Sequence, residues 1–122
     1  MPRYPEVCNM SRRKSETPFP ASNTMLVLAM LEGGDKYGYQ IIRELECRSD
    51  QTFSMKEGTL YPILYRLEDG NLVESRMGDK AGREPARKYY AITEQGRIAL
   101  REMFEIWSEF DRCVQAIMEG SE

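Results

Sequence analysis

The sequence predicts a mainly α-helical fold: a winged helix-turn-helix of three helices and a two-stranded β-wing, followed by a long C-terminal helix. Three observations predict it. Apolar residues with helical spacing recur in three segments between residues 21 and 70, and two short alternating segments then flank a polar turn. A seven-residue apolar repeat follows near the end of the chain. This order of elements is that of a winged helix with a C-terminal extension.

Composition limits the possible functions. The chain has 122 residues, 41% of them hydrophobic, which is enough for one domain with its own core. It contains no histidine, and this excludes nucleophile–histidine–acid catalysis and mixed Cys/His zinc sites. The three cysteines, Cys8, Cys47 and Cys113, form no C-x-x-C pair. We therefore expect no enzymatic activity, no cofactor and no metal site.

The sequence also predicts a cytoplasmic protein that does not enter the membrane. The longest apolar run, Met25–Leu31, is much shorter than the roughly 18–20 residues that cross a bilayer. The N-terminus lacks the charged, apolar and small-residue regions of a signal peptide. We expect reduced cysteines and no membrane partner.

Residues 1–20 hold four of the six prolines and a basic cluster, Arg12, Arg13 and Lys14. This composition predicts a flexible arm rather than a packed element. The arm is either a disordered tail or a basic segment that touches phosphates or a partner subunit. We expect a winged-helix domain at residues 21–93 to follow it, and a dimerisation helix at residues 94–122.

The first two helices are predicted at residues 21–32 and 38–48. The first segment is almost wholly apolar and free of glycine and proline, which is typical of a helix buried on most sides. The glycines at 33 and 34 end it. The second segment has one apolar face. The two helices are therefore expected to pack together in the core.

The third helix is predicted to follow Ser54, whose spacing to Glu57 has the form of a capping box. Gly70 ends it. One buried stripe obeys the i, i+3, i+4, i+7 rule. Its members are Leu60, Ile63, Leu64 and Leu67.

Pro62 leaves the start of this helix open. An internal proline loses a hydrogen bond and crowds the carbonyl group four residues back. Either the helix starts early and Gly58, at that position, relieves the crowding, or it starts near Thr59 with Pro62 in its tolerant first turn.

The wing and the last helix complete the predicted fold. Residues 72–77 and 89–92 alternate as strands do, and the polar residues 78–85 between them predict a turn. Thr93 is the predicted N-cap of a helix over residues 94–118.

The last helix carries an a/d pattern over about two and a half heptads. Its apolar residues are spaced 3, 4, 3, 4, 3: Leu100, Met103, Trp107, Phe110, Val114 and Ile117. We expect this seam to pack against a second copy in a homodimer, and packing back onto its own domain is the alternative. Trp107 is either an anchor of that interface or one wall of a site for a planar aromatic effector. The other predicted effector contacts are Met103 and Phe110, on either side of it in the seam.

The net charge of −3 is unevenly distributed. Residues 76–88 carry five basic and two acidic side chains, whereas residues 102–122 carry one basic and six acidic side chains. Positive charge therefore gathers at the wing, where it would neutralise DNA phosphates, although a solvated loop is the alternative. The predicted phosphate contacts are Arg76, Lys80, Arg83, Arg87 and Lys88.

The third helix also exposes residues that can contact DNA. Away from its leucine stripe it presents two tyrosines and an arginine, which offer hydrogen-bond donors and flat surfaces to a groove. Tyrosines also occur as half-buried core residues, so this face alone only indicates binding. The predicted contacts from this helix and the one before it are Tyr39, Arg43, Lys56, Thr59, Tyr61, Tyr65 and Arg66.

Four motifs follow one another in the chain: Tyr37-Gly38-Tyr39-Gln40-Ile41-Ile42, Glu57-Gly58-Thr59-Leu60-Tyr61-Pro62 with Leu67-Glu68, Gly70-x-Leu72-Val73, and Arg87-Lys88-Tyr89-Tyr90-x-Ile92-Thr93-x-x-Gly96. In this order they resemble the PadR family of bacterial transcriptional regulators, in its small subgroup with one C-terminal helix.

The resemblance implies a homodimeric repressor that binds an inverted repeat in double-stranded DNA. Residues 56–66 would enter the major groove, and residues 78–85 would approach the minor groove or the backbone. It also implies the early start of the third helix, and an aromatic effector in some members. Only Trp107 matches the effector site of one multidrug-binding member. The alternative is a winged-helix adaptor that binds proteins without specific DNA binding.

Overall fold

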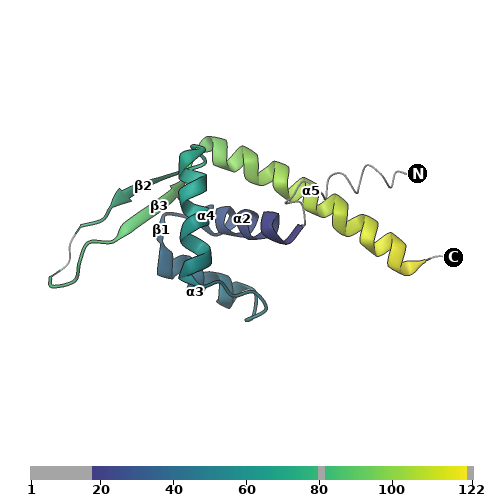
Figure 1. The fold of residues 1–122 in the computed structure, drawn as a ribbon, viewed down its shortest axis with the longest axis horizontal. Coiled ribbons are helices and arrows are strands. Elements are labelled where there is room, and N and C mark those ends of the chain that lie inside the picture. The colour runs from purple at the N-terminus through teal and green to yellow at the C-terminus, as the bar shows by residue number, and fades with distance from the viewer. Residues whose placement is uncertain (1–17, 80–81, 121–122) are drawn as a thin grey trace.

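The computed structural model describes residues 18–79 and 82–120, and these residues form a winged helix. The elements, in chain order, are α2 (Pro18–Leu31), β1 (Lys36–Tyr37), α3 (Gly38–Arg48), α4 (Glu57–Asp69), β2 (Val73–Met77), β3 (Lys88–Ile92) and α5 (Glu94–Glu119). Figure 1 shows the wing, which is the hairpin of β2 and β3, projecting at one end while α5 runs toward the other. The predicted fold class is confirmed. The predicted arm lies outside the described residues, except where α2 begins.

The core is built around α2, whose C-terminal half is buried on most sides, as predicted. Val27, Leu28 and Leu31 are buried, and they meet the stripe of α4, in which Leu60 and Leu64 have no exposed surface. The helix begins at Pro18, three residues earlier than predicted. Proline is tolerated in a first helical turn because the N–H group that it lacks would have no partner there.

The capping box predicted at Ser54 is wrong. The N-cap of α4 is Lys56, which makes no side-chain capping hydrogen bond, and the helix begins at Glu57. Met55 is buried in the core, so its side chain fixes the path of the chain just before the helix. The early start is confirmed, and Pro62 lies inside α4. The space at the Cα of Gly58 is open.

The sheet has three antiparallel strands in the order β1-β3-β2, one more than predicted. β1 has two residues, too few to show an alternating pattern. Side chains in the row of Tyr90 and Ser75 face the helices, and Tyr90 is buried. The next row, Tyr37, Tyr89 and Arg76, lies on the opposite face of the sheet.

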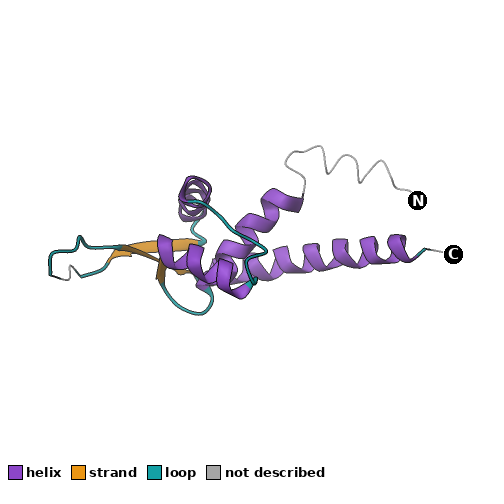
Figure 2. Cartoon of the chain, turned by 90° about the horizontal axis from the view of Figure 1, so that it is seen from below, coloured by secondary structure: helices purple, strands orange, loops and turns teal. Residues whose placement is uncertain are grey.

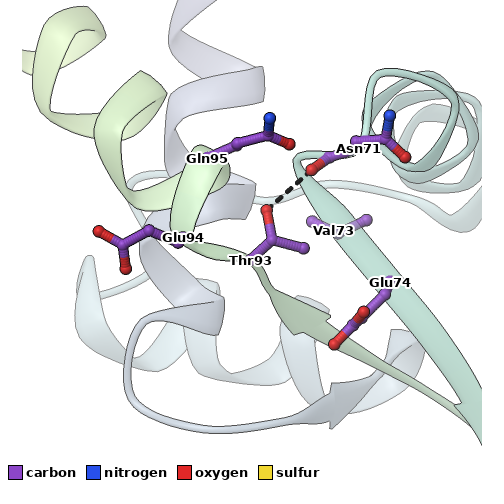
Figure 3. Close-up of a pocket in the computed structure, with 6 residues that line it drawn as sticks. All are labelled: Asn71, Val73, Glu74, Thr93, Glu94 and Gln95. Carbon is purple, nitrogen blue, oxygen red and sulfur yellow. Dashed lines mark hydrogen bonds between the residues drawn. The ribbon is translucent and has the colours of Figure 1, made fainter.

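Thr93 anchors α5 to the turn between α4 and β2. Its hydroxyl accepts a hydrogen bond from the Gly96 N–H at 3.0 Å, which confirms the predicted N-cap. The same hydroxyl donates to the Asn71 carbonyl oxygen at 2.8 Å, the bond drawn in Figure 3. The Thr93 N–H donates to the Leu72 carbonyl oxygen at 3.0 Å. Three hydrogen bonds therefore hold the base of α5.

The predicted seam of α5 divides into two parts. Leu100 is buried in the core of its own chain, and Met103 is partly buried against that core. The C-terminal part of the helix continues past the rest of the domain, as Figure 2 shows. There the exposed large apolar residues of the seam are Trp107, Phe110, Val114 and Ile117. Among the described residues, no helix has both the length and the apolar character of a membrane span.

Candidate nucleic-acid interface

A concavity of about 550 Å³ lies between α3, α4 and the β1–β3 edge of the sheet. We call it the tyrosine groove, because five of its nine lining residues are tyrosines. It brings together five of the predicted contacts: Tyr39, Tyr61, Tyr65, Arg87 and Lys88. Sequence reasoning missed its other members, which are Tyr37, Gly38, Glu57 and Tyr90.

The tyrosines of α4 form one wall of the groove. Tyr61 and Tyr65 lie one helical turn apart, with ring centroids 6.1 Å from each other. The Tyr61 ring packs onto Gly38, the first residue of α3, where a Cβ atom would overlap the hydroxyl and lie 2.7 Å from Cζ. Partial burial, and then the nearby charge of Glu57, raise the pKa of Tyr61. Its hydroxyl therefore stays protonated and can donate a hydrogen bond to a ligand.

Tyr90 belongs to both the core and the groove. Its side chain is 1% exposed, and Lys88 Nζ lies 5.7 Å from the ring centroid. Burial, together with the nearby Tyr65 and Glu68, raises the pKa of Tyr90 to about 12. The alternation of Tyr90 with Ile92 placed both on the inward face, and this signal could have identified Tyr90 from the sequence.

Arg87 lies at the rim of the groove and is held by two residues. Its guanidinium carbon is 4.4 Å from the centroid of the Tyr37 ring, and its Nη1 donates a hydrogen bond to the Tyr37 hydroxyl. Its Nη2 pairs with the Glu84 carboxylate at 3.3 Å. Arginine has five N–H donors, so these two bonds leave others for a ligand.

Tyr39 and Arg43 extend the surface along α3. The Arg43 Nη1 donates to the Tyr39 hydroxyl at 3.0 Å, and its guanidinium carbon lies 5.8 Å from the ring centroid. The hydrogen bond to Tyr39 is the main reason why the pKa of Arg43 is raised. Both side chains are exposed. The pair therefore presents a fixed positive charge beside the groove.

The structure does not bring the other predicted contacts into the groove. Lys56, the N-cap of α4, is exposed. Thr59 and Arg66 are exposed on α4 itself and lie on its other flank, roughly 150° around the helix from Tyr61. Arg83 is exposed in the turn of the wing. Lys80 lies outside the described residues.

Arg76, which the sequence predicted to contact phosphates from the wing, lies in a different environment. It lies on the face of the sheet opposite Tyr90, because strand side chains alternate. There its Nη2 pairs with the Asp35 carboxylate at 3.2 Å, and its guanidinium carbon lies 5.0 Å from the Tyr89 ring centroid. Arg76 therefore fastens β2 across the sheet instead of lining the groove.

A second concavity, of about 370 Å³, lies at the base of α5. Figure 3 shows its lining, which contains the carboxylates of Glu74 and Glu94 and no basic or aromatic side chain. Such a surface repels phosphate groups. The Thr93–Asn71 hydrogen bond crosses it, and its role is the structural one described above.

The residues predicted to bind an effector are only partly on the surface. Trp107 and Phe110 are exposed on α5, at 38% and 49%. Met103 is partly buried against the core of its own chain. In one chain, an aromatic ligand could thus reach the first two.

Comparisons with known proteins find similarity to one family of transcriptional regulators. The model of the transcriptional regulator PadR-like family matches residues 27–102. The chain is 36% identical over 97 residues to the uncharacterized protein X of Lysinibacillus sphaericus, which covers 80% of this chain and 88% of that protein. It is 30% identical over 97 residues to the transcriptional regulator YqjI of Escherichia coli, where the match covers 80% of this chain and 44% of that protein.

Solved structures share the fold. A PadR family transcriptional regulator from Eggerthella lenta superimposes with a TM-score of 0.71 at 29% identity, covering 96% of this chain and 92% of that one. A PadR family transcription regulator from Clostridium difficile gives a TM-score of 0.66 at 30% identity, covering 78% of this chain and 96% of that one.

Proposed function

Since this chain belongs to the PadR-like family of transcriptional regulators, we propose that it is a homodimeric repressor that binds an inverted-repeat operator in double-stranded DNA. The tyrosine groove carries this proposal. It places two basic side chains, Arg87 and Lys88, and the hydroxyls of Tyr61 and Tyr65 around one concavity beside α4. Hydroxyl donors and cations are the groups that contact phosphates and base edges in DNA.

In this proposal α4 enters the major groove and the wing follows the backbone. Thr59 and Arg66, on the exposed flank of α4, reach base edges, and arginine is the commonest partner of guanine there. Arg87 and Lys88 neutralise phosphates, as do Arg83 and Lys80 in the turn of the wing. Arg76 contributes least, because Asp35 already neutralises it.

The dimer is proposed to form along the part of α5 that projects beyond the domain. Trp107, Phe110, Val114 and Ile117 leave a continuous apolar stripe exposed, and a second copy can cover the same stripe on both chains about a two-fold axis. A planar aromatic effector would then bind beside Trp107, at the centre of the pair. The protein would act in the cytoplasm, where the chromosome lies.

The first experiment is selection of binding duplexes from a random-sequence library, followed by affinity measurements at several salt concentrations. We expect an inverted repeat, and an affinity that falls steeply with salt. Replacing Arg83 with alanine should reduce the slope of log K against log [salt] by about 0.9, the value for one lost phosphate contact. Arg112→Ala on α5 removes the same charge away from the groove and should leave the slope unchanged.

Recovery of no duplex above background would refute the proposal and favour the adaptor function.

The effector is tested separately, by titrating planar aromatic compounds while following Trp107 fluorescence. This signal is unambiguous because the chain has one tryptophan. Emission that stays constant at saturating concentrations would refute a site at Trp107.

A further inference from the structure

We propose that Tyr37 is a positioning residue, which fixes the guanidinium of Arg87 at the rim of the tyrosine groove so that it is ready to hold a DNA phosphate. The inference rests on the proposed function. It concerns a residue of β1, a strand that pairs only through Lys36 and Tyr37.

Two different contacts tie Arg87 to Tyr37. The ring lies under the guanidinium, 4.4 Å from its centroid to the guanidinium carbon, and the hydroxyl accepts a hydrogen bond from Nη1. The first contact sets the plane of the guanidinium, and the second sets its rotation within that plane. Lys88, the neighbouring cation in the groove, makes a more distant contact: its Nζ lies 5.7 Å from the centroid of the Tyr90 ring. Arg87 is therefore the more closely oriented cation of the two.

Tyr37 is itself held from the other side. Its ring meets the edge of Tyr89 with centroids 5.5 Å apart and planes at 81°. Tyr89 in turn packs under Arg76, which is fastened to Asp35. One row of side chains thus crosses the sheet and ends at Arg87. Tyr37 cannot turn without disturbing this row.

Orienting Arg87 before DNA binds strengthens the binding of DNA, because an arginine side chain has much conformational freedom to lose. A free arginine gives up several rotatable bonds when it grips a phosphate, and a pre-oriented one has given them up on folding. The Glu84 carboxylate, an exposed partner at 3.3 Å, is weakly held and can be exchanged for a phosphate. The Tyr37 contacts use the ring face and one N–H, so they can persist in the complex.

The test is a double-mutant cycle on the selected duplex, in the full chain. Tyr37→Phe keeps the ring and removes the hydroxyl acceptor, and we expect the affinity for DNA to fall about three- to tenfold. In an Arg87→Ala background the same change should alter affinity by less than about twofold. In an Arg83→Ala background, which removes an equivalent charge from the wing, the full loss should persist.

A second control separates positioning from folding. Tyr89→Phe removes a hydroxyl from the neighbouring ring but keeps the ring, which makes the contacts with Tyr37 and Arg76, and it should leave affinity unchanged. Urea unfolding of each variant should show equal stability for Tyr37→Phe and Tyr89→Phe.

The inference is overturned if Tyr37→Phe has the same effect in the Arg87→Ala and Arg83→Ala backgrounds, or no effect in the wild type. Either result would come from a protein that binds DNA, and so would leave the proposed function standing. A wild-type chain that selects no duplex would instead refute the proposed function.

Discussion

Gly96 and Gly58 are both helical glycines, and the structure predicts opposite effects when each is changed to alanine. Gly96, in the first turn of α5, lies against the turn between α4 and β2. A Cβ atom there would overlap the Leu72 carbonyl oxygen and come within 2.7 Å of Ile92 Cγ1. At Gly58, in the first turn of α4, a Cβ atom would meet no neighbouring atom within 4 Å.

The magnitude follows from three contributions. Moving the first turn of α5 away from Leu72 costs roughly 2 kcal/mol, as overpacking of a tight contact does. The displacement also weakens the hydrogen bond from the Thr93 N–H to the Leu72 carbonyl oxygen, for about 1 kcal/mol. Alanine regains about 1 kcal/mol through its higher helix propensity. Gly96→Ala should therefore lower the free energy of unfolding by about 2 kcal/mol, and Gly58→Ala should raise it by up to about 1 kcal/mol.

Urea unfolding followed by circular dichroism measures both variants against the wild type. Protein concentration must be equal in all samples, because self-association makes stability depend on concentration. A Gly96→Ala variant as stable as Gly58→Ala would refute the reasoning, since it would mean that the Leu72 carbonyl does not set the position of α5.

Three further predictions concern the groove and α5. The pKa of Tyr90 is raised to about 12 from an ordinary value near 10; this shift stabilises the fold below pH 10, and the stabilisation is lost as pH rises toward 12. The Tyr90→Phe variant should lose less stability than the wild type over that interval, by up to about 2–3 kcal/mol. An identical pH profile of the two proteins would contradict the shift. Gly38→Ala should push the Tyr61 ring out of the groove, and it should lower DNA affinity at unchanged salt slope; unchanged affinity would remove Tyr61 from the interface. Ile117, near the end of α5, is 74% exposed, and Ile117→Glu should convert a dimer to a monomer in analytical ultracentrifugation. Ile98→Glu, outside the seam, should not. Equal behaviour of the two variants would exclude the seam as the dimer interface.

Local signals predicted most of the fold from the sequence. The bounds of α3 are those predicted, and Thr93 caps α5 as expected. The errors arose where distant residues decide. Ser54 has the right spacing for a cap, but burial of Met55 fixes the chain there. β1 forms only because residues about 50 positions later pair with it, and such a short strand has no pattern of its own.

The candidate site was predicted only in part, for a related reason. Tyr61, Tyr65, Arg87 and Lys88 are recognisable by type and by their place on a helix or a wing. Whether a basic residue of the wing reaches the groove depends on the strand that carries it and on its partner across the sheet. Arg87, just before β3, lines the groove, whereas Arg76 lies on β2, on the side of β3 away from β1, and pairs with Asp35. A total of positive charges over residues 76–88 cannot distinguish these environments.

The hydrogen bonds at Thr93 have a mechanical consequence. α5 has 26 residues, which makes it a rod of about 39 Å at 1.5 Å per residue. Its base is fastened to Asn71 and Leu72, two of the three residues that join α4 to β2. A tilt of about 5° at that base displaces the free end by about 3 Å over this length. α5 therefore acts as a lever that pivots where α4 joins the wing. A movement at its far end produces a smaller movement at this junction. Both α4 and the wing border the tyrosine groove.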